Sequence, residues 1–345
     1  MPKMMKLNFP KEELKDINDI QISKFFSFIK KEAKRRISNN KCEICGTQTK
    51  LCNSHSVPKF VLKVIADNGN LANINKIINM PGTNSINGLN NAKTFTMLCP
   101  KCDKEFFSDY EEIKNWNSQP TDKMLAQIVA KIYLREIYKK DIELELFKTV
   151  RDNDKVQFGN LDYIQTLDLE GFKKEYNYAK KSINQTKRYY ISWYHKLDYI
   201  IPIALQGRIC LYGGFDDEII NQVYELEKTP KEMYICLFPF SDHSIIMMFA
   251  KERDTTYRNF FKQLNKMPLD EQLQTVSYIV FTYLEEYMCS PKLNLNHDMI
   301  KQSVENTDIY EEDLSKKQKI LNTVKEYSLS KRKDFPNILS KKYAI

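Results

Sequence analysis

The 345-residue chain has little glycine and no long apolar run, and each absence excludes some classes of protein. Glycine numbers only 9, against 20 tyrosines and 19 phenylalanines, so a globular and largely helical chain is expected and a disordered or repetitive one is excluded. The longest apolar runs, such as residues 244–250, have the length of a strand and cannot span a bilayer. The first residues are charged and lack the apolar core of a signal peptide, so we expect a soluble, cytoplasmic protein with no membrane association.

The eight cysteines do not have the spacing of a disulfide framework. Four of them form two Cys-x-x-Cys pairs, Cys42 with Cys45 and Cys99 with Cys102. Two thiolates from one tight turn can reach the same ion, and four thiolates complete a closed tetrahedral site. We therefore predict a structural Zn²⁺ at these four cysteines. Because such a site has no open position, this zinc is expected to stabilise the fold and not to catalyse.

The excess positive charge is confined to the part of the chain that holds the cysteine pairs. Residues 1–110 contain 18 lysines and arginines against 10 acidic residues, a net charge of +8, and the remainder contains 35 of each sign. This distribution suits a polyanionic partner. A solvated basic face would have the same composition, so charge alone does not separate the two interpretations.

The pattern of residues divides the chain into four parts. A basic N-terminal helix and a zinc module occupy residues 1–115, and a helical connector occupies 116–186. An α+β domain follows over 187–330, and a basic tail, expected to be mobile, over 331–345. We therefore predict the α+β fold class, with the C-terminal domain binding a protein partner or a second copy of the chain.

Local patterns predict the individual elements. Residues 68–93 are rich in asparagine and glycine and are expected to form a long loop between the cysteine pairs. The expected helices are 20–38, 58–67, one from 103 to 113, one starting after Thr121, 217–227, 257–264 and 270–289. The expected strands are 94–98, 189–194, 199–205, 208–212, 233–238 and 244–249.

Two motifs stand at the cysteine pairs. Ser54-His55-Ser56-Val57-Pro58-Lys59 follows the first pair, and Leu98-Cys99-Pro100-Lys101-Cys102-Asp103 contains the second. Over residues 40–112 this arrangement resembles the HNH, or ββα-metal, endonucleases. In many of them a Cys-x-x-Cys precedes a strand that ends in His-x-x-Pro, and a second Cys-x-x-Cys opens a helix whose first residue binds metal.

The resemblance implies a treble-clef zinc module with a nuclease site. His55 would be the general base that activates water, and imidazole suits that role near neutral pH. Asp103 would be the last ligand of a catalytic Mg²⁺ or Mn²⁺ ion. The resemblance further implies DNA as the substrate and a role in phage defence or in a mobile element.

The chain departs from the family pattern at three positions. Ser54 stands where an aspartate often holds the metal, and Asp103 replaces the commoner histidine. The middle asparagine of the pattern falls near Thr94, so Asn91 or its neighbour Asn90 would serve as the remaining ligand.

Alternative interpretations accompany each assignment. His55 could bond a backbone carbonyl within a zinc-finger hairpin, and Asp103 could favour the start of a helix through the helix dipole alone. The whole module could then be a catalytically inactive adaptor that binds nucleic acid or protein. A third class is a structural or toxin-like subunit that acts only within a complex.

Overall fold

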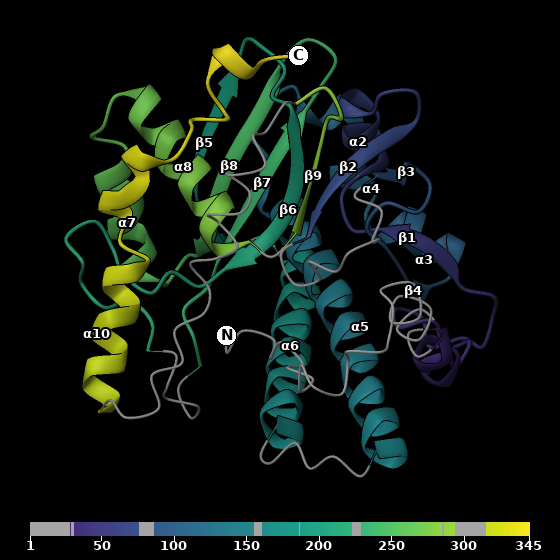
Figure 1. Cartoon of the computed structure of the whole chain (residues 1–345). Helices are drawn as coiled ribbons and strands as arrows, with labels where there is room; N and C mark the ends of the chain where they lie inside the picture. Colours follow the sequence, from purple (N-terminus) through teal and green to yellow (C-terminus); the bar gives the residue numbers. More distant parts are fainter. Residues whose placement is uncertain are drawn as a thin grey trace, which may run out of the picture.

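The computed structural model describes residue 28 and residues 31–75, 86–154, 161–185, 187–222, 229–284, 286–293 and 315–345 (Figure 1). The strands are β1 (Cys52–His55), β2 (Asn70–Asn75), β3 (Ile86–Gly88), β4 (Thr94–Leu98), β5 (Tyr190–Leu197), β6 (Ile203–Ile209), β7 (Met233–Pro239), β8 (Ser244–Lys251) and β9 (Glu286–Cys289). The α-helices are α2 (Lys59–Ile65), α3 (Pro100–Phe106), α4 (Ser108–Glu111), α5 (Asp122–Asp154), α6 (Leu161–Ile183), α7 (Thr255–Leu264), α8 (Leu269–Tyr283) and α10 (Lys316–Glu326). Short 3₁₀ helices are η1 (Ile113–Trp116), η2 (Leu329–Asp334) and η3 (Lys341–Tyr343). The mixture of helices and strands confirms the predicted α+β class.

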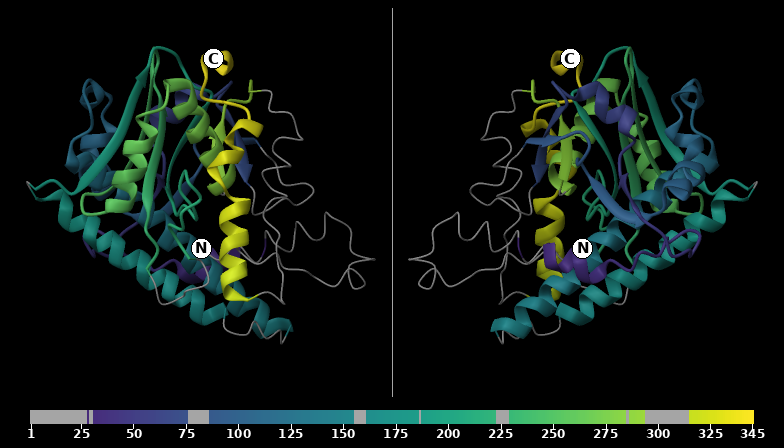
Figure 2. Two further views of the ribbon diagram at one scale, coloured as in Figure 1. Left: turned by 90° about the vertical axis from the view of Figure 1, so that its left-hand side faces the viewer. Right: turned by 90° about the vertical axis from the view of Figure 1, so that its right-hand side faces the viewer.

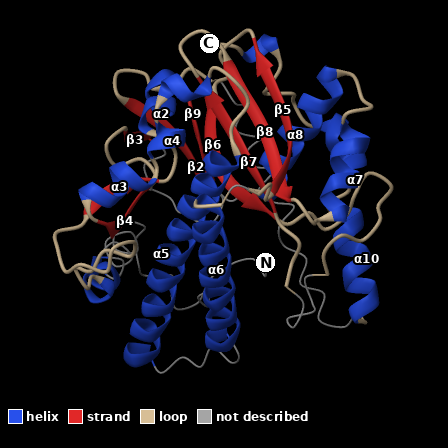
Figure 3. Cartoon of the chain, turned by 180° about the vertical axis from the view of Figure 1, so that it is seen from behind, coloured by secondary structure: helices blue, strands red, loops and turns tan. Residues whose placement is uncertain are grey.

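A seven-stranded antiparallel sheet in the order β3-β2-β9-β6-β7-β8-β5 forms the centre of the molecule (Figure 3). The interior strand β7 is buried on both faces, because alternate side chains enter two different cores. Ile235 and Leu237 join the core that contains α7 and α8. Tyr234 and Cys236 join the core that contains α5 and residues 40–112, the cysteine module, which includes α2. The sheet therefore separates the cysteine module from the helices that follow β8.

Two stretches between the cysteine pairs, β2 and β3, belong to this sheet, which corrects the prediction of a loop over 68–93, whereas β1 and β4 form a separate two-stranded sheet. β2 pairs with β3 on one side and with β9 on the other, with Ala72 opposite Cys289. Leu71 is fully buried, so the alternation of apolar and asparagine residues was a strand signal hidden by a loop-like composition. The cysteine module and the C-terminal region thus share one hydrogen-bonded sheet.

Four other predicted elements differ from the structure. The helix expected over 270–289 ends at Tyr283, because the chain becomes extended at Leu284 and then forms β9. The two strands expected over 199–205 and 208–212 are the single strand β6. Of the helix expected over 217–227, the described residues 217–222 are not helical, since a bridge joins Gly213 to Ile219.

Further predictions concern the ends of the chain. The helix expected over 20–38 lies mostly outside the described residues, although 31–37 are helical. The expected mobile tail is instead packed: Ile338 and Leu339 are fully buried, and the amide of Ile345 donates to the carbonyl of Ile200 at 3.1 Å. The prediction from basic composition failed because Lys333, Lys341 and Lys342 stay exposed while Ile338 and Leu339 pack into the core.

The helical connector is a long antiparallel pair, α5 with α6, which runs along one side of the molecule (Figure 2). The first half of α5 is almost entirely buried, from Met124 to Leu134. It packs between the cysteine module and the sheet and so connects them. None of the described helices has both the length and the apolar character needed to cross a bilayer.

Candidate metal centre and adjoining hairpin-helix site

The four cysteines of the two Cys-x-x-Cys pairs converge. Their sulfur atoms all lie within 4.8 Å of one another, and they could hold a metal ion such as zinc. The first pair sits in a tight turn, in which Gly46 has the positive φ of +70° and its amide donates to the carbonyl of Cys42 at 2.8 Å. The second pair opens α3, whose N-cap is Cys99. The geometry of four sulfur ligands fits zinc, as predicted.

Hydrogen bonds to the sulfurs of Cys42, Cys45 and Cys99 favour the thiolate form of these three cysteines. The amide of Cys99 donates to Sγ of Cys42 at 3.3 Å, and the amide of Cys102 donates to Sγ of Cys99 at 3.4 Å. Hydrogen bonds from Thr47 lower the pKa of Cys45 to about 6. Burial, followed by hydrogen bonding with the other three cysteines, raises the pKa of Cys102. Deprotonating all four thiols would place four negative charges close together, and a bound cation would offset their repulsion.

The cysteine pairs also fix a hairpin and a helix next to each other. β1 pairs with β4 in antiparallel fashion, with His55 opposite Thr94 and an irregularity between Cys52 and Ser54. The amide of Glu43 in the first turn donates to the carbonyl of Met97 at 3.0 Å. The second cysteine pair follows β4 directly, so β1, β4 and α3 lie together (Figure 1).

His55 stands at the end of β1 and is half-buried. Its Nε2 lies 3.0 Å from the carbonyl oxygen of Leu89. Because a carbonyl can only accept, Nε2 carries the proton and Nδ1 is left as the acceptor. Burial lowers the pKa of His55, although the bond to Leu89 opposes the shift. A bond from His55 to a backbone carbonyl is what we expect if the residue only stabilises the hairpin. The same bond would also orient the imidazole of a general base.

Asp103 lies on α3 but is engaged by a lysine of the connector helix. Its Oδ1 lies 3.0 Å from Nζ of Lys131, which also pairs with Glu111. The Lys131 side chain is only 1% exposed, and its Nζ stands 4.4 Å from the centre of the Phe107 ring. Burial raises the pKa of Glu111, while Lys131 opposes that shift.

Ser54 and Asp103 are brought near each other through Cys52. Ser54 is fully buried, and its Oγ lies 3.7 Å from Sγ of Cys52. The same sulfur lies 3.9 Å from Oδ2 of Asp103 and 3.3 Å from the carbonyl oxygen of Leu98. A thiol, and not a gap for an ion, therefore lies between these two expected ligands.

Asn91 is exposed in the turn before β4, and its described contacts are made by its backbone. Its amide donates to the carbonyl of Gly88 at 3.0 Å, and its carbonyl accepts from Oγ1 of Thr94 at 3.4 Å. The neighbouring Asn90 side chain instead accepts from Nζ of Lys59 at 2.8 Å. In the part of the chain that the structure describes, no hydrogen bond joins Asn91 to Ser54 or Asp103.

The expected Mg²⁺ or Mn²⁺ ligands do not fit such an ion in this arrangement. Asp103 is paired with Lys131, Ser54 is a weak ligand without charge, and the described contacts of Asn91 are made by its backbone. Among the described residues, the four-cysteine group is the only cluster of three or more His, Cys, Asp or Glu that could hold a metal.

Sequence reasoning missed Lys131 although a signal was present. Most residues around it, such as Ala130 and Ile132, are apolar and buried, and Gln127 lies one turn earlier on the same face. Two polar residues at i and i+4 inside an otherwise apolar stretch of helix indicate buried polar contacts. That the contacts are with Asp103 and Glu111 requires the tertiary structure.

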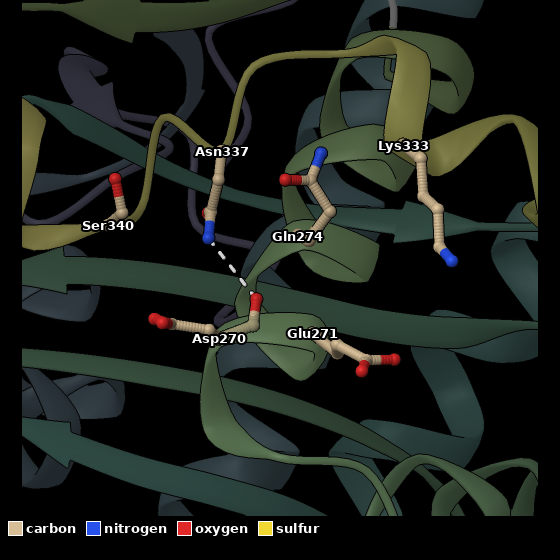
Figure 4. Close-up of a pocket in the computed structure, with 6 residues that line it drawn as sticks. All are labelled: Asp270, Glu271, Gln274, Lys333, Asn337 and Ser340. Atoms are coloured by element: carbon tan, nitrogen blue, oxygen red, sulfur yellow. Dashed lines mark hydrogen bonds between the residues drawn. The ribbon is translucent and has the colours of Figure 1, made fainter.

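A hollow of about 390 Å³ lies elsewhere, between the start of α8 and the C-terminal segment (Figure 4). Two of its lining side chains are hydrogen-bonded to backbone: the Gln274 amide donates to the carbonyls of Arg332 and Phe335, both at 2.6 Å, and Asn337 donates to the carbonyl of Asp270 at 3.2 Å. α8 packs on the opposite face of the sheet from the cysteine module. The hollow therefore contributes nothing to the predicted site.

Comparison of the chain with known proteins finds no matching family model, no matching curated protein and no matching solved structure.

Proposed function

We propose that the chain is an HNH-like nuclease that hydrolyses phosphodiester bonds of DNA, with His55 as the general base and a structural zinc ion at the four cysteines. The position of His55 carries the proposal. The cysteine pairs hold β1 beside α3, and His55 ends that strand with one ring nitrogen bonded to Leu89 and the other left to accept a proton.

The chemistry follows from that orientation. Nδ1 accepts a proton from a water molecule as the water oxygen bonds to phosphorus and the phosphorus–oxygen bond to one sugar breaks, and the departing sugar oxygen takes a proton from solvent. The bond from Nε2 to Leu89 keeps the ring from turning. The lowered pKa of His55 keeps the imidazole unprotonated at neutral pH. Lys59, one turn further along the motif, is exposed and could contact a phosphate.

The charge of the module supports a nucleic-acid partner. Exposed lysines stand on both helices that flank the hairpin: Lys59 and Lys63 on α2, and Lys101 and Lys104 on α3. Phosphates attract such side chains without regard to base sequence. Binding is therefore expected to weaken steeply as salt rises.

The test is the nicking of supercoiled plasmid by the zinc-loaded full chain, with and without added Mg²⁺ or Mn²⁺. We expect His55→Ala to reduce the rate by at least about 100-fold, since a general base contributes that much or more. His195→Ala is the matched control, because His195 is also half-buried and also bonded through Nε2, at 3.0 Å to Gln272. Equal rates for the wild type and His55→Ala would contradict the proposal.

A second candidate function is a binding module without catalysis, and one observation favours it. Lys131 already neutralises Asp103, the residue expected to bind a catalytic ion. This candidate predicts binding of DNA or of a protein with no cleavage under any metal, and binding unchanged by His55→Ala. A role for the C-terminal region in partner binding or self-association remains a prediction in either case.

A further inference from the structure

The β1–β4 hairpin and α3 form the hairpin-helix site, which contains His55 and Asp103. We propose that the ammonium group of Lys131 is the resident cation of this site and takes the place of a divalent ion. The inference rests on the proposed function for the position of the site, and it concerns the charge at that position. Lys131 comes from the connector helix α5 and lies outside the residues that resemble the nuclease family.

The ammonium group of Lys131 is contacted on three sides, by two carboxylates and one aromatic ring. It faces Oδ1 of Asp103 at 3.0 Å, it pairs with Glu111, and its remaining side lies against the Phe107 ring at 4.4 Å. Asp103 and Glu111 retain 22% and 27% exposure of their side chains, whereas Lys131 has 1%. A cation held in this way, between two carboxylates and an aromatic face, is part of the packed structure and not a surface charge.

The position of Lys131 is fixed independently of its own charge. Gln127, one turn earlier on α5, accepts from the amide of Tyr110 at 3.2 Å and donates to the carbonyl of Phe106 at 2.9 Å and to Asp109 at 2.7 Å. These bonds join α5 to the chain on both sides of Phe107. Lys131 is therefore directed at Asp103 by the docking of the helix.

The charges explain why a divalent ion is excluded. Asp103 and Glu111 together carry two negative charges, and Lys131 compensates one of them from within hydrogen-bond distance. A divalent ion that approached Asp103 would be repelled by the ammonium group at close range. It would be attracted by only one net negative charge, the one that Lys131 leaves uncompensated. Removal of the ammonium would leave two adjacent carboxylates, the ligand type that Mn²⁺ and Mg²⁺ prefer.

Lys131 is too buried to touch a substrate, so it acts as a positioning residue. It holds Oδ1 of Asp103, while Oδ2 remains near Sγ of Cys52. Any hydrolysis at His55 would therefore proceed without a divalent ion at Asp103 and would persist in a chelator that leaves the zinc in place.

The test measures metal binding, so that its outcome does not depend on activity. Zinc-loaded full-length protein is titrated with Mn²⁺ and free Mn²⁺ is followed by electron paramagnetic resonance, for the wild type, Asp103→Asn, Lys131→Met, Lys131→Arg and the double variant Lys131→Met/Asp103→Asn. We expect the wild type and Lys131→Arg to show no site that depends on Asp103. Lys131→Met should bind one Mn²⁺ at least about 10-fold more tightly than the wild type, since a nearby positive charge is gone. The double variant should lose that site.

Binding of Mn²⁺ by the wild type that Asp103→Asn abolishes would overturn the inference, and so would a folded Lys131→Met that gains no site. Should Lys131→Met fail to fold, the comparison of the wild type with Asp103→Asn still decides. Absence of cleavage in every variant would contradict the proposed nuclease and leave the metal-binding result intact.

Discussion

At the scale of single residues, His55 and Asp103 have different surroundings, although the family pattern pairs them. His55 is oriented by one backbone carbonyl, and among the described residues its other ring nitrogen has no hydrogen-bond partner. Asp103 is held by Lys131, a residue that lies 28 positions further along the chain. If His55 is the base, the acid limb of the pH dependence reports on the pKa of His55, to which, besides burial, the charges of Asp103, Lys59 and Lys131 also contribute.

We expect the acid limb of the pH profile of cleavage to lie below about pH 6.5, the ordinary pKa of histidine, because burial lowers the pKa of His55. The same shift has a consequence for stability: the unfolded chain binds the proton more readily, so the free energy of unfolding decreases as the pH falls through about 6.5. The acid limb is measured by kcat/KM against pH. The lowered pKa, on which both expectations depend, is measured by an NMR titration of the imidazole. An acid limb above pH 6.5 would contradict the prediction.

At the scale of elements, the two cysteine pairs connect a turn to a helix start. The sequence predicted these four residues correctly because Cys-x-x-Cys spacing is a local signal, and it predicted β7 and β8 because long apolar runs are local too. It did not predict β2 or β9. Their hydrogen-bond partners come from distant segments, and the Asn-rich sequence of β2 resembles a loop.

Loss of the metal is expected to destabilise the whole molecule, because the core that contains Cys42 and Cys99 continues through α5 to the sheet. Cys45→Ser should abolish stoichiometric zinc, measured by elemental analysis, and lower the Tm by about 10 °C. Cys52→Ser is the control, since Cys52 contacts Leu98 and Asp103 on either side of the second cysteine pair but is not one of the four residues of the cluster. Zinc retained at full stoichiometry in Cys45→Ser would rule out the four-cysteine site.

At the scale of the whole molecule, a buried group of charges joins the cysteine module, α5 and the sheet. Glu286 on β9 pairs with Arg135 of α5 and faces Lys93 and Lys139, each at 3.8 Å. The Lys93 ammonium also donates to the carbonyl of Glu286 at 2.7 Å, and the Lys93 carbonyl accepts from the amide of Ser56 at 2.9 Å. Against burial, which raises it, these cations hold the pKa of Glu286 far below its ordinary value. The group connects β9 to the residue that follows His55.

Glu286→Gln should lower the free energy of unfolding by about 3 kcal/mol, because it leaves buried cations without their anion. Urea denaturation measures this effect. The pKa of Glu286 is lowered on folding, so its contribution is present above about pH 4.3 and is lost as the pH falls further. Glu112→Gln, which removes the exposed pair with Lys114, is the matched control and should change stability little. Equal effects of the two substitutions would show that the buried group does not stabilise the fold.

The pairing of β2 with β9 has a consequence for how the chain folds during synthesis. All four cysteines leave the ribosome long before residues 286–289 are made, so zinc can close its site early. β2 must then wait for β9 with one edge unpaired, and such a long-range pairing forms slowly. We therefore expect a metal-bound nascent intermediate whose exposed strand edge is its main point of vulnerability to aggregation.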